Sequence, residues 1–198
     1  MIRATLAALA MTLSLAGAPA FAKTETIIVA GGCFWCVEKD FDHVAGVVST
    51  TSGYSGGTLA NPTYQNHEGH REVVRIEYDP ATVDARTLFD VFFRSVDPVD
   101  GGGQFCDRGY AYTTAIYVAG AAQKKAADAA KADAEKALGQ AIVTPVEAAG
   151  EFWDAEDYHQ DYYKKNPVRY KYYRYSCGRD ERVKELWGGA AHQGIAGF

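Results

Sequence analysis

A β-rich segment that runs into a glycine pair and then into a helical pattern is the feature that most limits the fold of this sequence. Residues 24–30 (TETIIVA) have the β-branched content of a strand. Gly31 and Gly32 end the strand, and residues 33–44 then carry apolar side chains at helical spacing. This strand–glycine–helix unit indicates a fold in which helices pack on a sheet.

The rest of the chain continues to alternate between the two patterns. Further strands are predicted at residues 47–54, 72–78, 113–118 and 142–146, and further helices at residues 83–96, 121–138 and 152–165. Residues 55–71 and 101–109 are predicted to be loops. A loop as long as residues 55–71 is usually functional in a compact domain. We therefore predict an α+β sandwich, with helices on a small mixed or antiparallel sheet.

Residues 1–22 have the features of a secretory signal peptide. A positive charge at Arg3 precedes an apolar stretch, and residues 20–22 (AFA) form an A-x-A cleavage site. Cleavage there would leave residues 23–198 as a single domain, in the periplasm or secreted. No other apolar run is long enough to cross a bilayer.

Charge and cysteine content narrow the class of protein. The formal net charge of −5 gives no basis for a nucleic-acid or anionic-membrane partner. The four cysteines all lie after the leader, and they are Cys33, Cys36, Cys106 and Cys177. Four are too few for a disulfide scaffold in a domain of this size, but thiols in an oxidising compartment pair or react.

Cys33 is placed where a thiol becomes reactive. It opens a predicted helix, whose N-terminus carries unpaired N–H groups and about half a positive charge. Phe34 and Trp35 follow it and supply an apolar wall beside the sulfur. Such a sulfur suits a small apolar group that carries a polar oxygen. The alternative is a buried structural cysteine among core aromatic side chains.

Six motifs along the chain resemble those of one enzyme family. They are GCFWxxE at residues 32–38, GYSGG at 53–57, NPTY at 61–64, GHREVVRIEYDP at 69–80, CDRGYAYTTAIY at 106–117 and FWDAEDYHQDYYKKNP at 152–167. In their order and nearly complete coverage they resemble class A methionine sulfoxide reductase, the peptide-methionine (S)-S-oxide reductase family. The resemblance implies a ferredoxin-like α/β sandwich, and it alone implies the S epimer.

The resemblance also implies the chemical roles at the site. Cys33 matches the nucleophile that attacks the sulfoxide sulfur, and Glu72 matches the acid that protonates the oxygen. Tyr64 and Tyr112 match tyrosines that hydrogen-bond this oxygen. A sulfoxide is a poor electrophile until its oxygen is protonated, so such a site needs a carboxylic acid kept neutral by an apolar pocket.

Further residues have matches in the same family. Asp107 matches an aspartate that helps to shape the site, and Phe34 and Trp35 match the pocket for the substrate's S-methyl group. No cofactor is implied. We expect no metal site either, since His67 and His70 are read as loop residues.

The reaction leaves a sulfenic acid on Cys33, which a second thiol must convert to a disulfide before a thioredoxin-type reductant resets the enzyme. Three thiols are candidates for this resolving role. Family members commonly use a cysteine on a mobile C-terminal segment, so the resemblance favours Cys177. Cys36 is the second choice because it is close in sequence, and Cys106 is the third because it neighbours Asp107. We expect a monomer.

Three positions depart from the usual family pattern. Many members have glycine in place of Cys36, alanine in place of Arg71 and arginine in place of Thr113. The first departure adds a thiol beside the nucleophile. The last removes a contact that would support the region of Asp107.

Two other classes of protein remain alternatives. A thioredoxin-like disulfide oxidoreductase would explain the Cys-x-x-Cys pair, and Thr144-Pro145 could face that pair, but it would leave the acid and the tyrosines unexplained. A zinc-binding module needs two closely spaced pairs of ligands, and the sequence has one cysteine pair.

Overall fold

The computed structural model describes residues 23–198, so the predicted leader lies outside the described residues. The main sheet contains β1 (Glu25–Gly31), β2 (Val47–Ser55), β3 (Arg71–Tyr78), β6 (Thr114–Val118), β7 (Val146–Ala148) and β8 (Phe152–Asp154). The helices are α1 (Phe34–Phe41), α2 (Ala85–Phe93), α3 (Ala121–Leu138), α4 (Tyr162–Lys165), α5 (Pro167–Ser176) and α6 (Arg179–Trp187). Strands β4 (Gly103–Gln104) and β5 (Asp107–Arg108) form a separate small hairpin, and two short 3₁₀ turns are η1 (Tyr110–Tyr112) and η2 (Gly188–Ala190).

The sheet has the topology of a ferredoxin-like split βαβ fold. Its order is β7-β6-β1-β3-β2-β8, and the four inner strands all pair antiparallel. In chain order β1, α1, β2, β3, α2 and β6 make two interleaved βαβ units. Strand β7 adds in parallel beside β6, so the sheet is mixed. The predicted α+β sandwich with a mixed sheet is confirmed.

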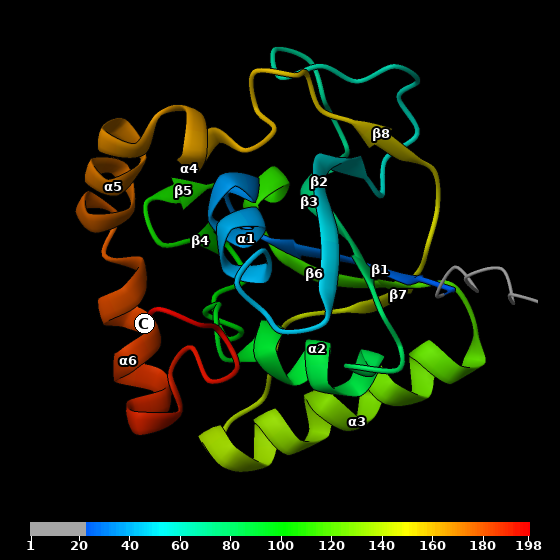
Figure 1. Cartoon of the computed structure of the whole chain (residues 1–198), viewed down its shortest axis with the longest axis vertical. Coiled ribbons are helices and arrows are strands. Elements are labelled where there is room, and N and C mark those ends of the chain that lie inside the picture. The colour runs from blue at the N-terminus through cyan, green and yellow to red at the C-terminus, as the bar shows by residue number, and fades with distance from the viewer. Residues whose placement is uncertain (1–22) are drawn as a thin grey trace, which may run out of the picture.

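One face of the sheet carries most of the core. Phe34 and Phe41 of α1 and Phe89 of α2 are buried against Val29 and Ile76 of the central strands. Helix α3 lies along α2, and Figure 1 shows the two side by side below the sheet. Each buried phenylalanine stabilises the fold by about 1.5–3 kcal/mol. This packing fixes α1 at the carboxyl end of β1, so the first turn of α1 has a defined place.

Two predicted elements are wrong. Residues 142–145 do not form a strand: β7 begins only after Pro145, which has no N–H to donate to a ladder. Residues 152–165 do not form one helix. Residues 152–154 form β8 on the edge of β2, where the Phe152 ring covers Gly53, and only 162–165 are helical.

The C-terminal residues form two helices that the sequence interpretation left undefined. Helix α5 contacts α1 through the Arg174–Asp40 ion pair, and Figure 1 shows α6 below α5. A disulfide between Cys106 and Cys177 joins the hairpin region to the turn between α5 and α6. Among residues 23–198, no helix has the length and apolar character needed to span a membrane.

Candidate active site

The turn between β1 and α1 places Cys33 at the N-cap of the helix. Gly32 has a φ of 79°, and a Cβ there would lie 2.5 Å from Cβ of Gln104, so only glycine fits. The carbonyl of Cys33 accepts the N–H of Cys36 at 3.1 Å, which starts the helix. Only 6% of Cys33 is exposed, so the sulfur faces a pocket rather than open solvent.

That pocket gathers seven of the predicted site residues from five separate parts of the chain, and Tyr173 from a sixth. It has a volume of about 50 Å³ and is lined by Cys33, Phe34, Trp35, Tyr64, Glu72, Asp107, Tyr112 and Tyr173. Seven of these eight side chains are the ones that the sequence predicted for catalysis and substrate binding. A larger groove of about 430 Å³ runs between α1, α5 and the C-terminal residue, and it is lined by none of them.

Glu72 has the electrostatic environment of a general acid. Its side chain is 2% exposed, and burial raises the pKa of its carboxyl to about 8, although the Phe34 backbone N–H donates to Oε2 at 3.0 Å and opposes this rise. At neutral pH the carboxyl is therefore mostly protonated and can donate a proton. The same N–H bond ties the acid to the first turn of α1, beside Cys33.

The two predicted tyrosines remain neutral donors. Burial, with the nearby Glu72 carboxyl, raises the pKa of Tyr64 and of Tyr112. The Tyr64 backbone N–H donates to the Glu156 carboxylate at 3.0 Å, which anchors the long loop that carries this tyrosine. Both phenol groups can therefore keep an O–H directed to an oxygen in the pocket.

The indole ring of Trp35 is held on two sides. It stacks on Tyr162 with centroids 3.7 Å apart and planes 8° apart. Its Nε1–H donates to Nδ1 of His159 at 3.0 Å. A wall fixed in this way keeps its shape when a substrate enters.

Cys33 and Cys36 are both free thiols and contact each other. Burial, together with the hydrogen bond to Cys36, raises the pKa of Cys33. Burial also acts to raise the pKa of Cys36, but the hydrogen bond from Cys33 and the charges of Arg174 and Arg179 outweigh it and lower that pKa to about 7. Arg174 is itself buried and pairs with Asp40 at 2.9 Å. The opposite shifts make Cys33 the weaker acid of the two thiols.

Tyr173 of α5 is a site residue that the sequence interpretation missed. Its hydroxyl donates a hydrogen bond to the Asp107 carboxylate, and its side chain lines the same pocket as Cys33. Its ring meets Trp35 edge to face, with centroids 5.8 Å apart. The sequence did offer one indication of its place, because Tyr173 lies four residues, or one helical turn, before the candidate site residue Cys177.

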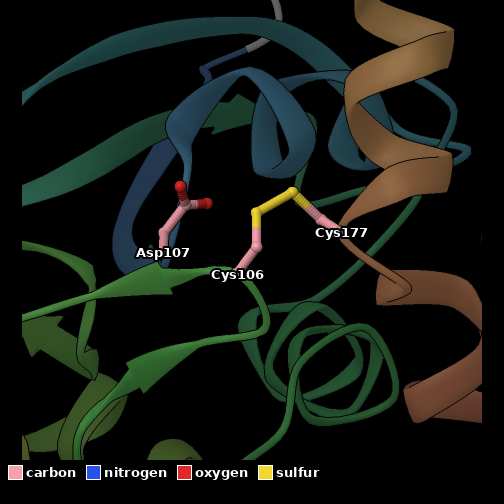
Figure 2. Close-up of side chains that lie close together, drawn as sticks. All are labelled: Cys106, Asp107 and Cys177. Carbon is pink, nitrogen blue, oxygen red and sulfur yellow. A yellow bond between two sulfur atoms is a disulfide. The ribbon is translucent and has the colours of Figure 1, made fainter.

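The Cys106–Cys177 disulfide lies close to the Asp107 carboxylate. Figure 2 shows the Cys106–Cys177 bond next to this carboxylate, and the two sulfurs and a carboxylate oxygen lie within 4.8 Å of one another. In this structure Cys177 is thus paired with Cys106, not with Cys33. The sequence-based choice of Cys177 as the thiol that attacks Cys33 stays a prediction, and it requires this bond to open first.

Two departures from the family pattern form one contact here. The guanidinium of Arg71 donates to the Thr113 hydroxyl at 2.8 Å and to the Tyr117 hydroxyl at 2.7 Å. Thr113, where the resemblance led us to expect an arginine, thus accepts a hydrogen bond from an arginine on β3.

The alternative site classes do not match the geometry. Pro145 does not line the Cys33 pocket, and its carbonyl accepts the N–H of Ile116 in the sheet. Among residues 23–198, the one close group of potential metal ligands is Cys106, Asp107 and Cys177, and its two sulfurs are bonded to each other.

Comparison with known proteins agrees with the geometry. The family model for peptide methionine sulfoxide reductase matches residues 25–191. The chain is 56% identical over 177 residues to peptide methionine sulfoxide reductase MsrA 2 of Rhizobium meliloti, covering 88% of this chain and 89% of that protein. It is 47% identical over 188 residues to the MsrA 2 protein of Caulobacter vibrioides, covering 92% and 95%.

Solved structures give the same result. Methionine sulfoxide reductase A of Corynebacterium diphtheriae superposes with a TM-score of 0.67 at 36% identity, over 73% of this chain and 76% of that one. Mxr1 of Saccharomyces cerevisiae in complex with Trx2 superposes with a TM-score of 0.52 at 26% identity, over 76% and 92%. The fold, the pocket and the matches together place this chain in the peptide methionine sulfoxide reductase family.

Proposed function

We propose that this chain reduces methionine-S-sulfoxide in oxidised proteins and peptides to methionine. The observation that carries the proposal is the single pocket in which a helix-capping thiol, a neutral buried carboxyl group and two phenol donors meet. A nucleophile, an acid and oxygen donors are what sulfoxide reduction requires. Membership in the family supports the same reaction.

The first step transfers the oxygen atom to sulfur. Cys33 attacks the sulfoxide sulfur as a thiolate while Glu72 gives a proton to the oxygen. Tyr64 and Tyr112 hydrogen-bond the oxygen as its negative charge grows. The S–O bond of the substrate is exchanged for one on Cys33, so the products are methionine and a Cys33 sulfenic acid. Phe34 and Trp35 enclose the S-methyl group.

The experiment that tests the proposed function uses resolved epimers. Purified chain, supplied with thioredoxin, thioredoxin reductase and NADPH, is expected to convert methionine-S-sulfoxide in a peptide to methionine and to leave the R epimer unchanged. Product analysis by chromatography measures both. Turnover of insulin disulfides without turnover of either sulfoxide would instead favour a thioredoxin-like oxidoreductase.

Cys36 is the thiol best placed to resolve the sulfenic acid. It contacts Cys33, it is free, and its pKa of about 7 supplies thiolate at neutral pH. The Cys36 thiol would condense with the sulfenic acid, releasing water and forming a Cys33–Cys36 disulfide. The reduced Cys106 and Cys177 thiols would then exchange with the Cys33–Cys36 disulfide. This exchange regenerates the Cys33 and Cys36 thiols and leaves a Cys106–Cys177 disulfide.

Exposure explains why a second pair is useful. Cys33 and Cys36 are buried, with 6% and 2% of each residue exposed, so a protein reductant cannot reach a bond between them. Cys106 is exposed and Cys177 is half-buried. A thioredoxin-type dithiol would reduce this outer disulfide by thiol exchange.

Mapping of trapped disulfides tests the order of these steps. After one equivalent of sulfoxide, reduced Cys177→Ser is expected to hold a Cys33–Cys36 disulfide, found by peptide mass spectrometry, and to stop after one turnover with thioredoxin. The matched variant Cys106→Ser should give the same product. If Cys36→Ser instead forms a Cys33–Cys177 bond and cycles at the wild-type rate, Cys177 resolves directly and this order is wrong.

We propose that residues 1–22 direct export and are removed after Ala22, so that the enzyme acts as a monomer in the periplasm or outside the cell. The A-x-A site supports this location. An oxidising compartment also suits a chain whose four cysteines all follow the leader. N-terminal sequencing of the exported chain should find Lys23 first, and a retained leader would contradict export.

A further inference from the structure

We propose that Arg179 is a positioning residue, which holds the outer thiols Cys106 and Cys177 beside Cys33 while the disulfide between them is open. The inference rests on the proposed function, and it supplies what keeps the outer pair within reach of Cys33 once its own bond has been reduced. Its basis is one buried guanidinium group that joins the chain next to Cys177 to the chain next to Cys33 and Cys106.

The backbone of Arg179 is tied to Cys177. Arg179 is the first residue of α6 and follows Cys177 by two residues, and Gly178 between them has a φ of 66° that makes the turn from α5 to α6. The side chain is 2% exposed, so it points into the protein rather than into solvent. A contact that fixes this side chain therefore also restricts the position of Cys177.

The guanidinium reaches the end of the strand that leads into Cys33. Nη1 donates to the carbonyl oxygen of Gly31 at 3.1 Å, and Nη2 donates to the carbonyl oxygen of Ser95 at 2.9 Å. Gly31 is the last residue of β1 and lies two residues before Cys33. Because both N–H groups belong to one rigid plane, they fix the α5–α6 turn against the β1–α1 turn.

The same guanidinium contacts the segment that carries Cys106. Its central carbon lies over the ring of Phe105, 4.8 Å from the ring centroid. Phe105 has a φ of 56°, a left-handed conformation that residues other than glycine seldom adopt, so packing has to hold it there. The contact with Arg179 supplies such packing directly before Cys106.

These contacts do not depend on the disulfide. In the oxidised state the Cys106–Cys177 bond itself joins the hairpin region to the α5–α6 turn. Reduction removes that covalent link, but the hydrogen bonds of Arg179 involve no sulfur and can persist. Leaving a buried charged donor without its acceptors is costly, so the guanidinium resists separation of Cys177 from the β1–α1 turn.

Transfer of the disulfide needs this closeness twice. One outer thiolate attacks the Cys33–Cys36 bond and forms a mixed disulfide, and the other outer thiolate then attacks that bond and closes Cys106–Cys177. The outer thiols lose two electrons and two protons, and the inner pair gains them, so the exchange needs no other reactant. Asp107, which follows Cys106, lines the Cys33 pocket, so the outer pair already lies next to its target.

The charge of Arg179 offers a rival explanation. Burial acts to raise the pKa of Cys36, but the hydrogen bond with Cys33 and the charges of two arginines, this one and Arg174, lower it to about 7. The Nε of Arg179 also lies 3.8 Å from the Asp40 carboxylate. Lysine keeps the charge, but its single ammonium group cannot reproduce a plane that bonds two carbonyls and stacks on a ring. Arg179→Lys therefore separates positioning from charge.

The test follows two products in one time course. Reduced, desalted enzyme is mixed with one equivalent of a methionine-S-sulfoxide peptide and quenched with acid at intervals, and free thiols are then alkylated. Chromatography measures the methionine peptide, and peptide mass spectrometry measures the Cys106–Cys177 disulfide. We expect Arg179→Lys to slow formation of this disulfide by about 10–10²-fold and methionine formation by less than about threefold, since a small misplacement of a reacting group can cost about 10²-fold.

Matched variants decide between the possible roles. Arg169→Lys makes the same substitution at an exposed arginine of α5 and should keep both rates. Arg179→Gln removes the charge as well and should slow the disulfide at least as much as Arg179→Lys. If Arg179→Lys keeps the wild-type ratio of the two rates and only Arg179→Gln loses it, the role belongs to the charge and the proposal is wrong. Equal slowing of both products in Arg179→Lys would mean a purely structural role and would also overturn it.

A second substitution covers the case in which Arg179→Lys does not fold, which circular dichroism would show. Phe105→Leu keeps every charge and removes the ring on which the guanidinium lies, so it should also slow the disulfide selectively. An unchanged ratio of rates in Phe105→Leu would then contradict the proposal. Failure of the proposed function is a separate result, since the wild-type enzyme would then form no methionine.

Discussion

Serine in place of Cys33 is expected to abolish sulfoxide reduction, with a loss of at least about 10³-fold even in a single turnover. A hydroxyl is a far weaker nucleophile than a thiolate and cannot form the sulfenic acid that stores the oxygen atom. The substitution is small, and Cys33 makes its N-cap contacts through its backbone, so the fold should persist. Rapid-quench assay of methionine from the S epimer measures the loss.

Two measurements guard the interpretation of this variant. Circular dichroism should match the wild type, which separates lost chemistry from lost structure. If Cys33→Ser keeps its methionine burst, the nucleophile has been assigned wrongly, and Cys36, the other free thiol that contacts it, becomes the candidate.

Glutamine in place of Glu72 is expected to slow the chemical step by about 10²-fold or more, the range that a general acid supplies. The amide can still accept the Phe34 N–H but has no proton to give. In the wild type the acid form is active, so the single-turnover rate should fall as pH rises through the Glu72 pKa of about 8. Glu72→Gln should lose this fall, and rates measured from about pH 6 to pH 9 would reveal it.

Glu77→Gln is the matched control, because Glu77 lies on the same strand and bonds to Ser49 far from the pocket. It should keep both the rate and the pH profile. A Glu72→Gln variant that still loses activity above about pH 8 would show that another group supplies the proton, and Asp107 is the other carboxyl residue that lines the pocket.

The alternation of strands and helices could be predicted from the sequence because it depends on the local spacing of apolar residues. The helix at residues 121–138 was predicted with its observed bounds, since an Ala- and Lys-rich run with a helical period ends there at Gly139. The ferredoxin-like sandwich was predicted from the family that the motifs resemble. The motifs also assembled seven pocket side chains that lie far apart in the sequence.

Contacts between segments that are distant in the sequence could not be predicted from local spacing. Residues 152–154 have helical spacing, but Phe152 pairs with β2 because Gly53, about a hundred residues earlier, leaves room for its ring. The position of Tyr173 in the pocket was not predicted, for the same reason. Its partner Asp107 is 66 residues away, and periodicity within α5 carries no information about that meeting.

The Cys106–Cys177 cross-link has a consequence for the lifetime of the enzyme. It closes a loop with a sequence separation of 71 residues, and a cross-link of this span restricts the unfolded chain by an amount worth about 4 kcal/mol. If each catalytic cycle opens this bond, the molecule gives up a large share of its margin against unfolding in every turnover. The reductant that restores activity would at the same moment loosen the fold, so a well-supplied enzyme would be the less durable one.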